Sequence, residues 1–463
     1  MLNLRKGILL LLMVVVTFSC NDDDDDNDFI SPEPLNIVEI AMASDDLNSL
    51  VAALQAADGD LVGVLSGPGP FTVLAPTDAA FDTFLADNNF GSLNDVPTDV
   101  LSQVLLNHVV SGKVRSGDLV GSGNGYTNTN ATGAGDSPMS LYFNTDNGVR
   151  FNGVSSVTVA DIEASNGVVH VVDAVIGLPN IVTHALANPD LSSLVAALTT
   201  DGNTTFTDLL SSPGDFTVFA PDNSAFSAFG NPNDNDLNQI LSNHVIVGTT
   251  ALSSGLSNSY VNTAATFGNT DKNLSLYINT DSGVTLNGAS NVAAADIIAS
   301  NGVIHAVDAV IDLPTVVDFA LADPTFETLV AALTRSDLTF DYVSALSTPN
   351  GTSPAPFTVF APTNTAFSDL LSELNASGLG DIDEPTLKAT LDHHAVAGAN
   401  VQSSGLTDNM TISTLGGDIT ANVTGGATLT DANGRVSNII AVDVQAANGV
   451  IHAIDKVILP NLN

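Results

Sequence analysis

Cysteine, tryptophan and basic side chains are scarce in this chain of 463 residues. It has one cysteine, no tryptophan, and 10 lysine and arginine residues against 51 aspartate and glutamate residues, a formal net charge of -41. A single thiol cannot form an intrachain disulfide, a Cys-x-x-Cys zinc site or an iron–sulfur cluster. Because phosphate groups are bound by basic surfaces, the charge argues against nucleic acid and anionic lipid surfaces as partners.

The remaining composition is that of a folded protein. Apolar residues make up 44% of the chain and charged residues 13%, so hydrophobic cores can be buried. At roughly 100–200 residues per domain, the length predicts about three domains. The acidic surplus favours solubility through self-repulsion, and weak, diffuse binding of divalent cations is the alternative interpretation.

The N-terminus has the pattern of an export signal. Arg5 and Lys6 precede an apolar run, 8–16, that is too short to span a bilayer, and Ser19 and Cys20 follow. The pattern resembles a bacterial lipoprotein signal, which implies a signal peptide at 1–19 and lipidation of Cys20. A plain secretory signal cut nearby is the alternative.

Residues 20–34 are predicted to form an acidic tether. The run Asp22 to Asp26 repels itself and is expected to stay extended and solvated. It resembles the acidic stretch of surface-exported lipoproteins of the Bacteroidetes group. This resemblance implies a lipid anchor in the outer membrane with the protein on the outer face, and the periplasmic face is the alternative.

Beyond the tether, one unit of about 140 residues occurs three times, at 35–179, 180–314 and 315–463. The first shared motif is FTVLAP or FTVFAP, at 71–76, 216–221 and 357–362. Its alternation predicts a strand that ends at proline. Thr77, Asp222 and Thr363 then follow as expected helix N-caps. The next phenylalanines are expected to face the core: Phe81, Phe226 and Phe367.

The second shared motif begins with Asn-Gly and contains a histidine and an aspartate, at 166–173, 301–308 and 448–455. Asn-Gly between β-rich runs predicts a two-residue hairpin turn. Counting from that turn places His170 opposite Glu163, with Asp161 as a diagonal neighbour.

Six of the eight histidines recur at two positions of the unit. The central histidines are His108, His244 and His394, and the closing histidines are His170, His305 and His452. We interpret all six as structural groups that are hydrogen-bonded within the fold, with metal binding as the alternative. The two histidines outside this pattern, His184 and His393, are expected to be exposed.

Together, the two motifs and the central histidine resemble the fasciclin-like domain family in three tandem copies. This implies an α+β fold for each copy, a β-sandwich or wedge of about seven strands flanked by helices. The chain departs from the family at one position, because Asn107, Asn243 and His393 stand where members usually have tyrosine.

No catalytic motif is present: the chain has no GxSxG, HExxH, P-loop or Rossmann fingerprint. We therefore expect no cofactor, no metal and no enzymatic activity; an enzyme of unrecognised type has no supporting motif. The resemblance implies a cell-surface adhesion or binding protein, lipid-anchored, that contacts matrix, an extracellular polysaccharide, a protein ligand or other cells. The alternative is a structural spacer or scaffold in the cell envelope without a ligand of its own.

Overall fold

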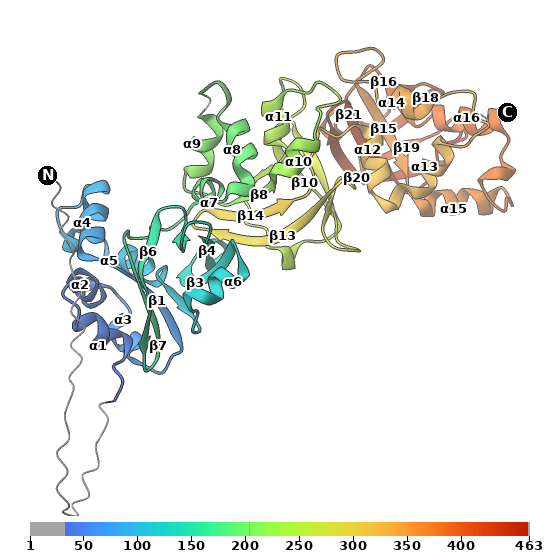
Figure 1. Ribbon diagram of the computed structural model, residues 1–463. Helices are drawn as coiled ribbons and strands as arrows, with labels where there is room; N and C mark the ends of the chain where they lie inside the picture. Colours follow the sequence, from blue (N-terminus) through green and yellow to red (C-terminus); the bar gives the residue numbers. More distant parts are fainter. Residues whose placement is uncertain (1–32, 203, 462–463) are drawn as a thin grey trace, which may run out of the picture. The chain divides into compact units, whose positions relative to one another are not determined.

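The computed structural model describes residues 33–202 and 204–461 (Figure 1). Cys20, the predicted signal peptide and nearly all of the tether therefore lie outside the described residues. The described chain contains three seven-stranded sheets, each with its own helices. This confirms the predicted α+β fold. In the described part, no helix has the length and apolar character needed to cross a membrane.

The three sheets share one strand order. In the first domain it is β2-β1-β7-β6-β5-β4-β3, and the other two sheets repeat it. The pairs β1–β7, β8–β14 and β15–β21 are parallel, and the other pairs are antiparallel. Each strand of the first motif therefore lies beside the strand of the second motif, one strand in from the edge of its sheet.

The strands have the following bounds. In the first domain they are β1 (Phe71–Pro76), β2 (Val109–Ser111), β3 (Gly125–Thr132), β4 (Pro138–Asn144), β5 (Arg150–Phe151), β6 (Ser155–Ala164) and β7 (Gly167–Val172). In the second they are β8 (Phe216–Pro221), β9 (Val245–Val247), β10 (Ser259–Thr266), β11 (Asn273–Asn279), β12 (Thr285–Leu286), β13 (Ser290–Ala299) and β14 (Gly302–Val307). In the third they are β15 (Phe357–Pro362), β16 (Ala395–Ala397), β17 (Met410–Thr414), β18 (Gly417–Asn422), β19 (Thr428–Thr430), β20 (Val436–Ala446) and β21 (Gly449–Ile454).

The helices are short, and in each domain three of them precede the strand of the first motif. The first domain has α1 (Ile37–Met42), α2 (Asn48–Ala56), α3 (Leu61–Ser66), α4 (Asp78–Asp87), α5 (Thr98–Leu106) and α6 (Ser116–Ser122). The second has α7 (Ile181–Ala187), α8 (Ser192–Leu198), α9 (Thr205–Ser211), α10 (Asn223–Ala228) and α11 (Leu237–Ser242). The third has α12 (Val316–Ala322), α13 (Glu327–Leu333), α14 (Tyr342–Leu346), α15 (Asn364–Glu373) and α16 (Glu384–Asp392).

The strand–proline–cap prediction is confirmed in all three copies. The side chains of Thr77, Asp222 and Thr363 accept hydrogen bonds from the backbone N–H groups three residues later. Phe81 and Phe367 are buried in the core as expected. Phe226 departs from the pattern because it is only half-buried.

The predicted Asn-Gly turn is wrong by one residue. Ala164 pairs with Gly167, so Ser165 and Asn166 form the turn. The Asn166 side chain bonds to distant segments: its Oδ1 accepts from Ile37 N (3.0 Å), and its Nδ2 donates to Leu65 O and Gly67 O (both 2.8 Å). Asn301 and Asn448 make the corresponding three bonds in their own domains. This asparagine therefore joins the turn to the first and third helices of each domain.

The glycine after this asparagine is required by the neighbouring strand. A Cβ atom at Gly449 would lie 2.3 Å from the carbonyl oxygen of Phe357, with which Gly449 is paired in the parallel ladder. The same close approach occurs at Gly167 and Gly302. The motif therefore combines an asparagine that makes tertiary bonds with a glycine that admits the strand of the first motif.

Replacing this asparagine is expected to destabilise its domain strongly. In Asn448→Ala, the buried N–H of Val316 and the carbonyl groups of Leu346 and Thr348 lose their partner. We expect a loss of about 3 kcal/mol in the free energy of unfolding of the third domain, because unpaired buried polar groups cost about 1–3 kcal/mol each. Urea denaturation followed by circular dichroism measures it.

The control is Ser372→Ala, since the Ser372 hydroxyl makes one exposed bond to Ser368 O. We expect this control to change stability by less than about 0.5 kcal/mol. Equal stabilities of the two variants would contradict the role assigned to Asn448.

Candidate functional site at the recurring histidines

The central histidines are buried and use both ring nitrogens. The ring of His108 follows α5, and its Nδ1 lies 2.7 Å from Val104 O while its Nε2 accepts from Ile176 N (2.9 Å). His244 and His394 repeat this arrangement with their own helices and closing segments. Because one nitrogen faces a carbonyl group and the other an N–H group, each ring is held neutral with the proton on Nδ1.

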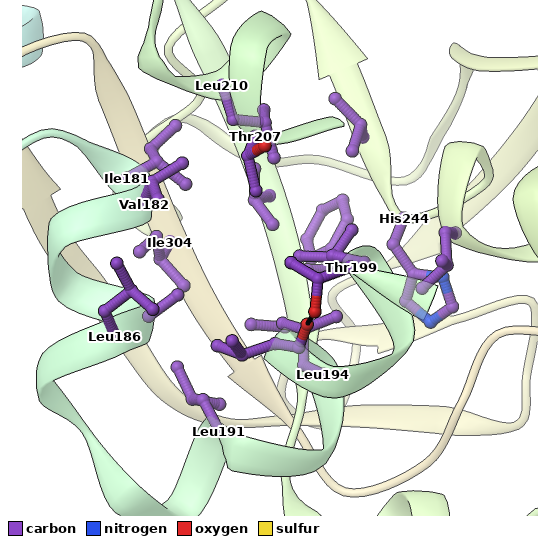
Figure 2. A pocket seen from close by; sticks show the side chains of 18 residues that line it. Ile181, Val182, Leu186, Leu191, Leu194, Thr199, Thr207, Leu210, His244 and Ile304 are labelled. Carbon is purple, nitrogen blue, oxygen red and sulfur yellow. Dashed lines mark hydrogen bonds between the residues drawn. The ribbon is translucent and has the colours of Figure 1, made fainter. Parts of the chain in front are cut away.

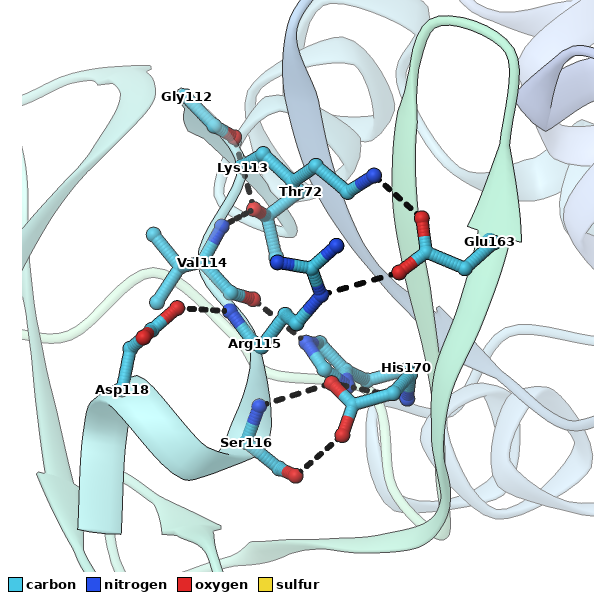
Figure 3. Close-up of polar contacts among 10 residues, drawn as sticks. Thr72, Gly112, Lys113, Val114, Arg115, Ser116, Asp118, Glu163 and His170 are labelled. Carbon is cyan, nitrogen blue, oxygen red and sulfur yellow. Dashed lines mark hydrogen bonds and ion pairs between the residues drawn. The ribbon is translucent and has the colours of Figure 1, made fainter. Parts of the chain in front are cut away.

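The closing histidines carry their proton on the other nitrogen. His170 Nδ1 accepts from Asp161 N (3.1 Å). Its Nε2 lies 2.9 Å from Val114 O, to which it donates, and Figure 3 shows His170 beside Val114. His305 and His452 make the same pair of bonds, to Asp296 N and Ala251 O and to Asp443 N and Val401 O. Each closing histidine therefore connects two neighbouring segments of its own domain.

The aspartate opposite each closing histidine lies in a β-bulge. Asp161 has φ 59°, in the left-handed region, and its carboxylate accepts from both the backbone N–H and the hydroxyl of Ser116 at the start of α6. Asp296 with Ser253 and Asp443 with Ser403 repeat this contact. The Ser116 hydroxyl bond is the main cause of the lowered pKa of Asp161.

The expected register is therefore wrong. Asp161 lies opposite His170, and Glu163 pairs with Val168. The cause is the turn position, because a turn that begins one residue earlier moves every cross-strand partner by two residues. The residue opposite the closing histidine is consequently acidic in all three domains.

These hydrogen bonds occupy the ring nitrogens that a metal ion would need at the six histidines. A metal ion binds the lone pair of a neutral imidazole nitrogen, and here each such lone pair already accepts a backbone N–H. The carboxylate oxygen of Asp161 lies 3.9 Å from His170 Nδ1. Within 33–202 and 204–461, no group of three or more histidine, cysteine, aspartate or glutamate side chains could hold a metal ion.

The expectation that His184 and His393 are exposed is wrong, since they are 0% and 5% exposed. His184 lies on α7 with its Nε2 3.2 Å from Ile298 O, and burial lowers its pKa to about 4. The sequence repeat indicates this burial, because the third domain has an apolar residue, Phe319 of α12, at the matching position. His393 corresponds to the buried Asn107, and its Nδ1 lies 2.7 Å from Ala389 O.

The first domain also carries a charged cluster that the other domains lack. Glu163 accepts from the ammonium group of Lys113 and from Arg115 Nε (3.0 Å), as Figure 3 shows. The Lys113 bond is the first cause of the lowered pKa of Glu163. Ile298 and Gln445 occupy the matching place, and both are buried.

Comparison with known proteins places this geometry in a family. The model of the fasciclin domain matches three stretches of the chain, at 45–179, 189–314 and 324–460. The chain belongs to the fasciclin domain family. Each of the three matched ranges contains one of the three sheets and both shared motifs.

Relatives of this fasciclin protein come from distant organisms. Protein sll1483 of Synechocystis sp. is 40% identical over 142 residues, which are 31% of this chain and 73% of that protein. Transforming growth factor-beta-induced protein ig-h3 of Sus scrofa is 29% identical over 446 residues, covering 94% of this chain but 59% of that protein. A solved FAS1 domain pair from the insect cell adhesion molecule fasciclin I has a TM-score of 0.37 and 18% identity, and covers 58% of this chain and 97% of that chain.

Acidification is expected to destabilise the second fasciclin domain more than the other two. Burial lowers the pKa of His184 and His244 to about 4, and it also lowers the pKa of His305. Unfolded histidine titrates near 6.5, so the unfolded state binds more protons below that pH. Stability is therefore full above about pH 6.5 and falls as the pH drops towards 4, by about 1.4 kcal/mol per pH unit for His184 and for His244, and His305 adds to the loss in the same direction.

Urea unfolding at several pH values between 7 and 4.5, resolved by domain through hydrogen exchange, measures this slope. His184→Phe introduces the residue that the third domain has at this position. This variant is expected to lose the contribution of one histidine to the pH dependence of the second domain's free energy of unfolding. A second domain with equal stability at pH 7 and pH 5 would contradict the assignment of neutral, buried rings.

Proposed function

We propose that this chain is a non-enzymatic adhesion or binding protein of the cell surface, an array of fasciclin domains that a lipid on Cys20 anchors to the outer membrane. The observation that carries the proposal is the tandem of three fasciclin domains, aligned with ig-h3 over 94% of the chain. Domains of this family also occur in fasciclin I, an insect cell adhesion molecule. The chain spans 59% of ig-h3, so the ligands of that relative are not transferred to it.

The internal repeats indicate where a ligand would bind. The residues that all three domains share are engaged within the fold: the asparagine of the turn, the central and closing histidines, and the aspartate of the bulge. The asparagine and the two histidines therefore make their hydrogen bonds inside the domain, whereas the bulge aspartate, although bonded to the serine, is about one-third exposed in the first two domains. The ligand surface is therefore expected among residues that differ between domains, such as Lys113, Arg115 and Glu163 of the first domain.

Direct contacts connect consecutive domains. Ile298 N donates to Ser140 Oγ (2.9 Å), and Gln445 N donates to Ser275 Oγ (3.0 Å). A tandem connected in this way supports multivalent contact, in which several weak sites act together. It equally suits the alternative function, a spacer or scaffold without a ligand.

The net charge limits the chemistry of the partner. At -41, the chain repels polyanions, so a neutral polysaccharide or a protein with a basic surface fits better than nucleic acid or an acidic glycan. We propose an extracellular polysaccharide or protein ligand of this kind.

Binding of the purified full chain to a glycan array and to its own cells, at low and moderate salt, tests the proposed function. We expect retention on a neutral glycan or on cells, and reduced adhesion of a strain that lacks the protein. No retention on any surface, together with normal adhesion of the deletion strain, would contradict adhesion and favour the spacer.

The proposed anchor is tested separately with Cys20→Ser. We expect this variant to leave the membrane fraction, because the thiol that carries the lipid is lost. Protease treatment of intact cells is expected to cleave the parent protein. Membrane retention of the variant would contradict the anchor, and resistance of the parent while a known surface protein is cut would contradict placement on the outer face.

A further inference from the structure

The second fasciclin domain contains a cavity in its hydrophobic core. Its volume is about 260 Å³, and it lies between α7, α8 and α9 on one side and β8 and β14 on the other. Figure 2 shows Ile181, Val182 and Leu186 of α7 across the space from Thr199 and Thr207. The corresponding space in the third domain, between α12, α13 and α14, measures about 30 Å³.

Differences between the three copies explain this cavity. In the first and third domains, Phe81 and Phe367 are 1% exposed and pack in the main core, whereas Phe226 is half-buried. Phe226 packs only at the border of its core, and two further positions that are buried in the other domains are exposed here. Leu101 and Leu387 are buried but Leu237 is exposed, and Val96 and Ile382 are buried but Pro232 is exposed.

The helices show why these side chains fill less of the core in the second domain. Helix α10 has 6 residues where α4 and α15 each have 10. Helix α11 begins at Leu237 itself, so this leucine is the first helical residue, whereas α5 begins three residues before Leu101. The segment before α11 is rich in Asn and Asp and supplies no apolar side chain to the core.

The lining offers hydrocarbon and no free polar group. Three polar residues line the cavity, and all of them are already bonded: both His244 nitrogens bond to the backbone, Thr199 Oγ1 donates to Val195 O, and Thr207 Oγ1 donates to Thr204 O. A water molecule needs two to four polar partners in a cavity, so this one suits apolar atoms. A cavity of about 150 Å³ with a similar lining takes up benzene, so the space here is sufficient for a larger apolar group.

The cavity has an exposed edge. Leu186 is 67% exposed and Thr199 is also exposed, and both line the cavity from α7 and from the end of α8. A ligand can therefore leave its polar end at the surface here and place its chain among the leucines. Because the protein carries a net charge of -41, a carboxylate end would be repelled and an uncharged end would not.

We propose that the second fasciclin domain binds one hydrocarbon chain of an uncharged amphiphile, with the chain in the cavity and the neutral polar end at the edge formed by Leu186 and Thr199. This site is independent of the adhesive function, because its lining is internal to one domain.

Equilibrium dialysis of the full chain against radiolabelled 1-decanol tests the proposal. Ala185 lines the cavity, and Ala320 lines the small space of the third domain, which makes a matched pair of variants. We expect saturable binding of one molecule per chain, at least tenfold weaker binding in Ala185→Leu, and unchanged binding in Ala320→Leu. The probe is also expected to raise the melting temperature of the second domain, because it binds only the folded state.

Thermal unfolding shows whether the variants fold. Ala185→Leu fills empty space and is expected to keep or raise the melting temperature, whereas Ala320→Leu overpacks its domain and is expected to lower it. If Ala185→Leu fails to fold, Thr207→Leu replaces it, since the matching residues are Val62 and Val343. Absence of saturable binding, or full binding by a folded cavity-filling variant, would overturn the proposal.

Discussion

The structure of each domain depends on three hydrogen bonds from one asparagine side chain, which is buried in the second and third domains and partly buried in the first. The asparagine that precedes the last strand bonds to the start of the first helix and to the end of the third, about 90 to 130 residues away in the sequence. The glycine beside it admits the strand of the first motif at a distance that any Cβ atom would block. These contacts close the longest loop of the domain, so they offset much of the entropy lost when its ends meet.

The histidines complete the same internal network. The central ring connects the helix before the second strand to the segment after the last strand, and the closing ring connects the last strand to the bulge and to the segment before α6 or its equivalent. The central ring is protonated on Nδ1, which faces a carbonyl group, and the closing ring is protonated on Nε2 for the same reason. Since every polar group is paired, the rings are inexpensive to bury when neutral and costly to bury when protonated.

Local features of the fold could be predicted from the sequence, and features that depend on distant partners could not. The strand–proline–cap motif was predictable because proline and the N-cap act on neighbouring residues. The turn at Asn166 was misplaced because its side-chain partners lie far away in the sequence. Burial of His184 was likewise missed, although Phe319 at the matching position indicates a core site. The cavity arises from the lengths of α10 and α11, and helix ends are poorly defined by sequence alone.

The central claim is that the shared polar residues serve the interior of each domain, and amide hydrogen exchange tests it most directly. The N–H groups of Ile176, Ile311 and Ile458 bond to the central histidines, and those of Asp161, Asp296 and Asp443 bond to the closing ones. The account predicts that these six amides exchange as slowly as the central strands of their own domains. Exchange as fast as that of exposed loops would contradict it.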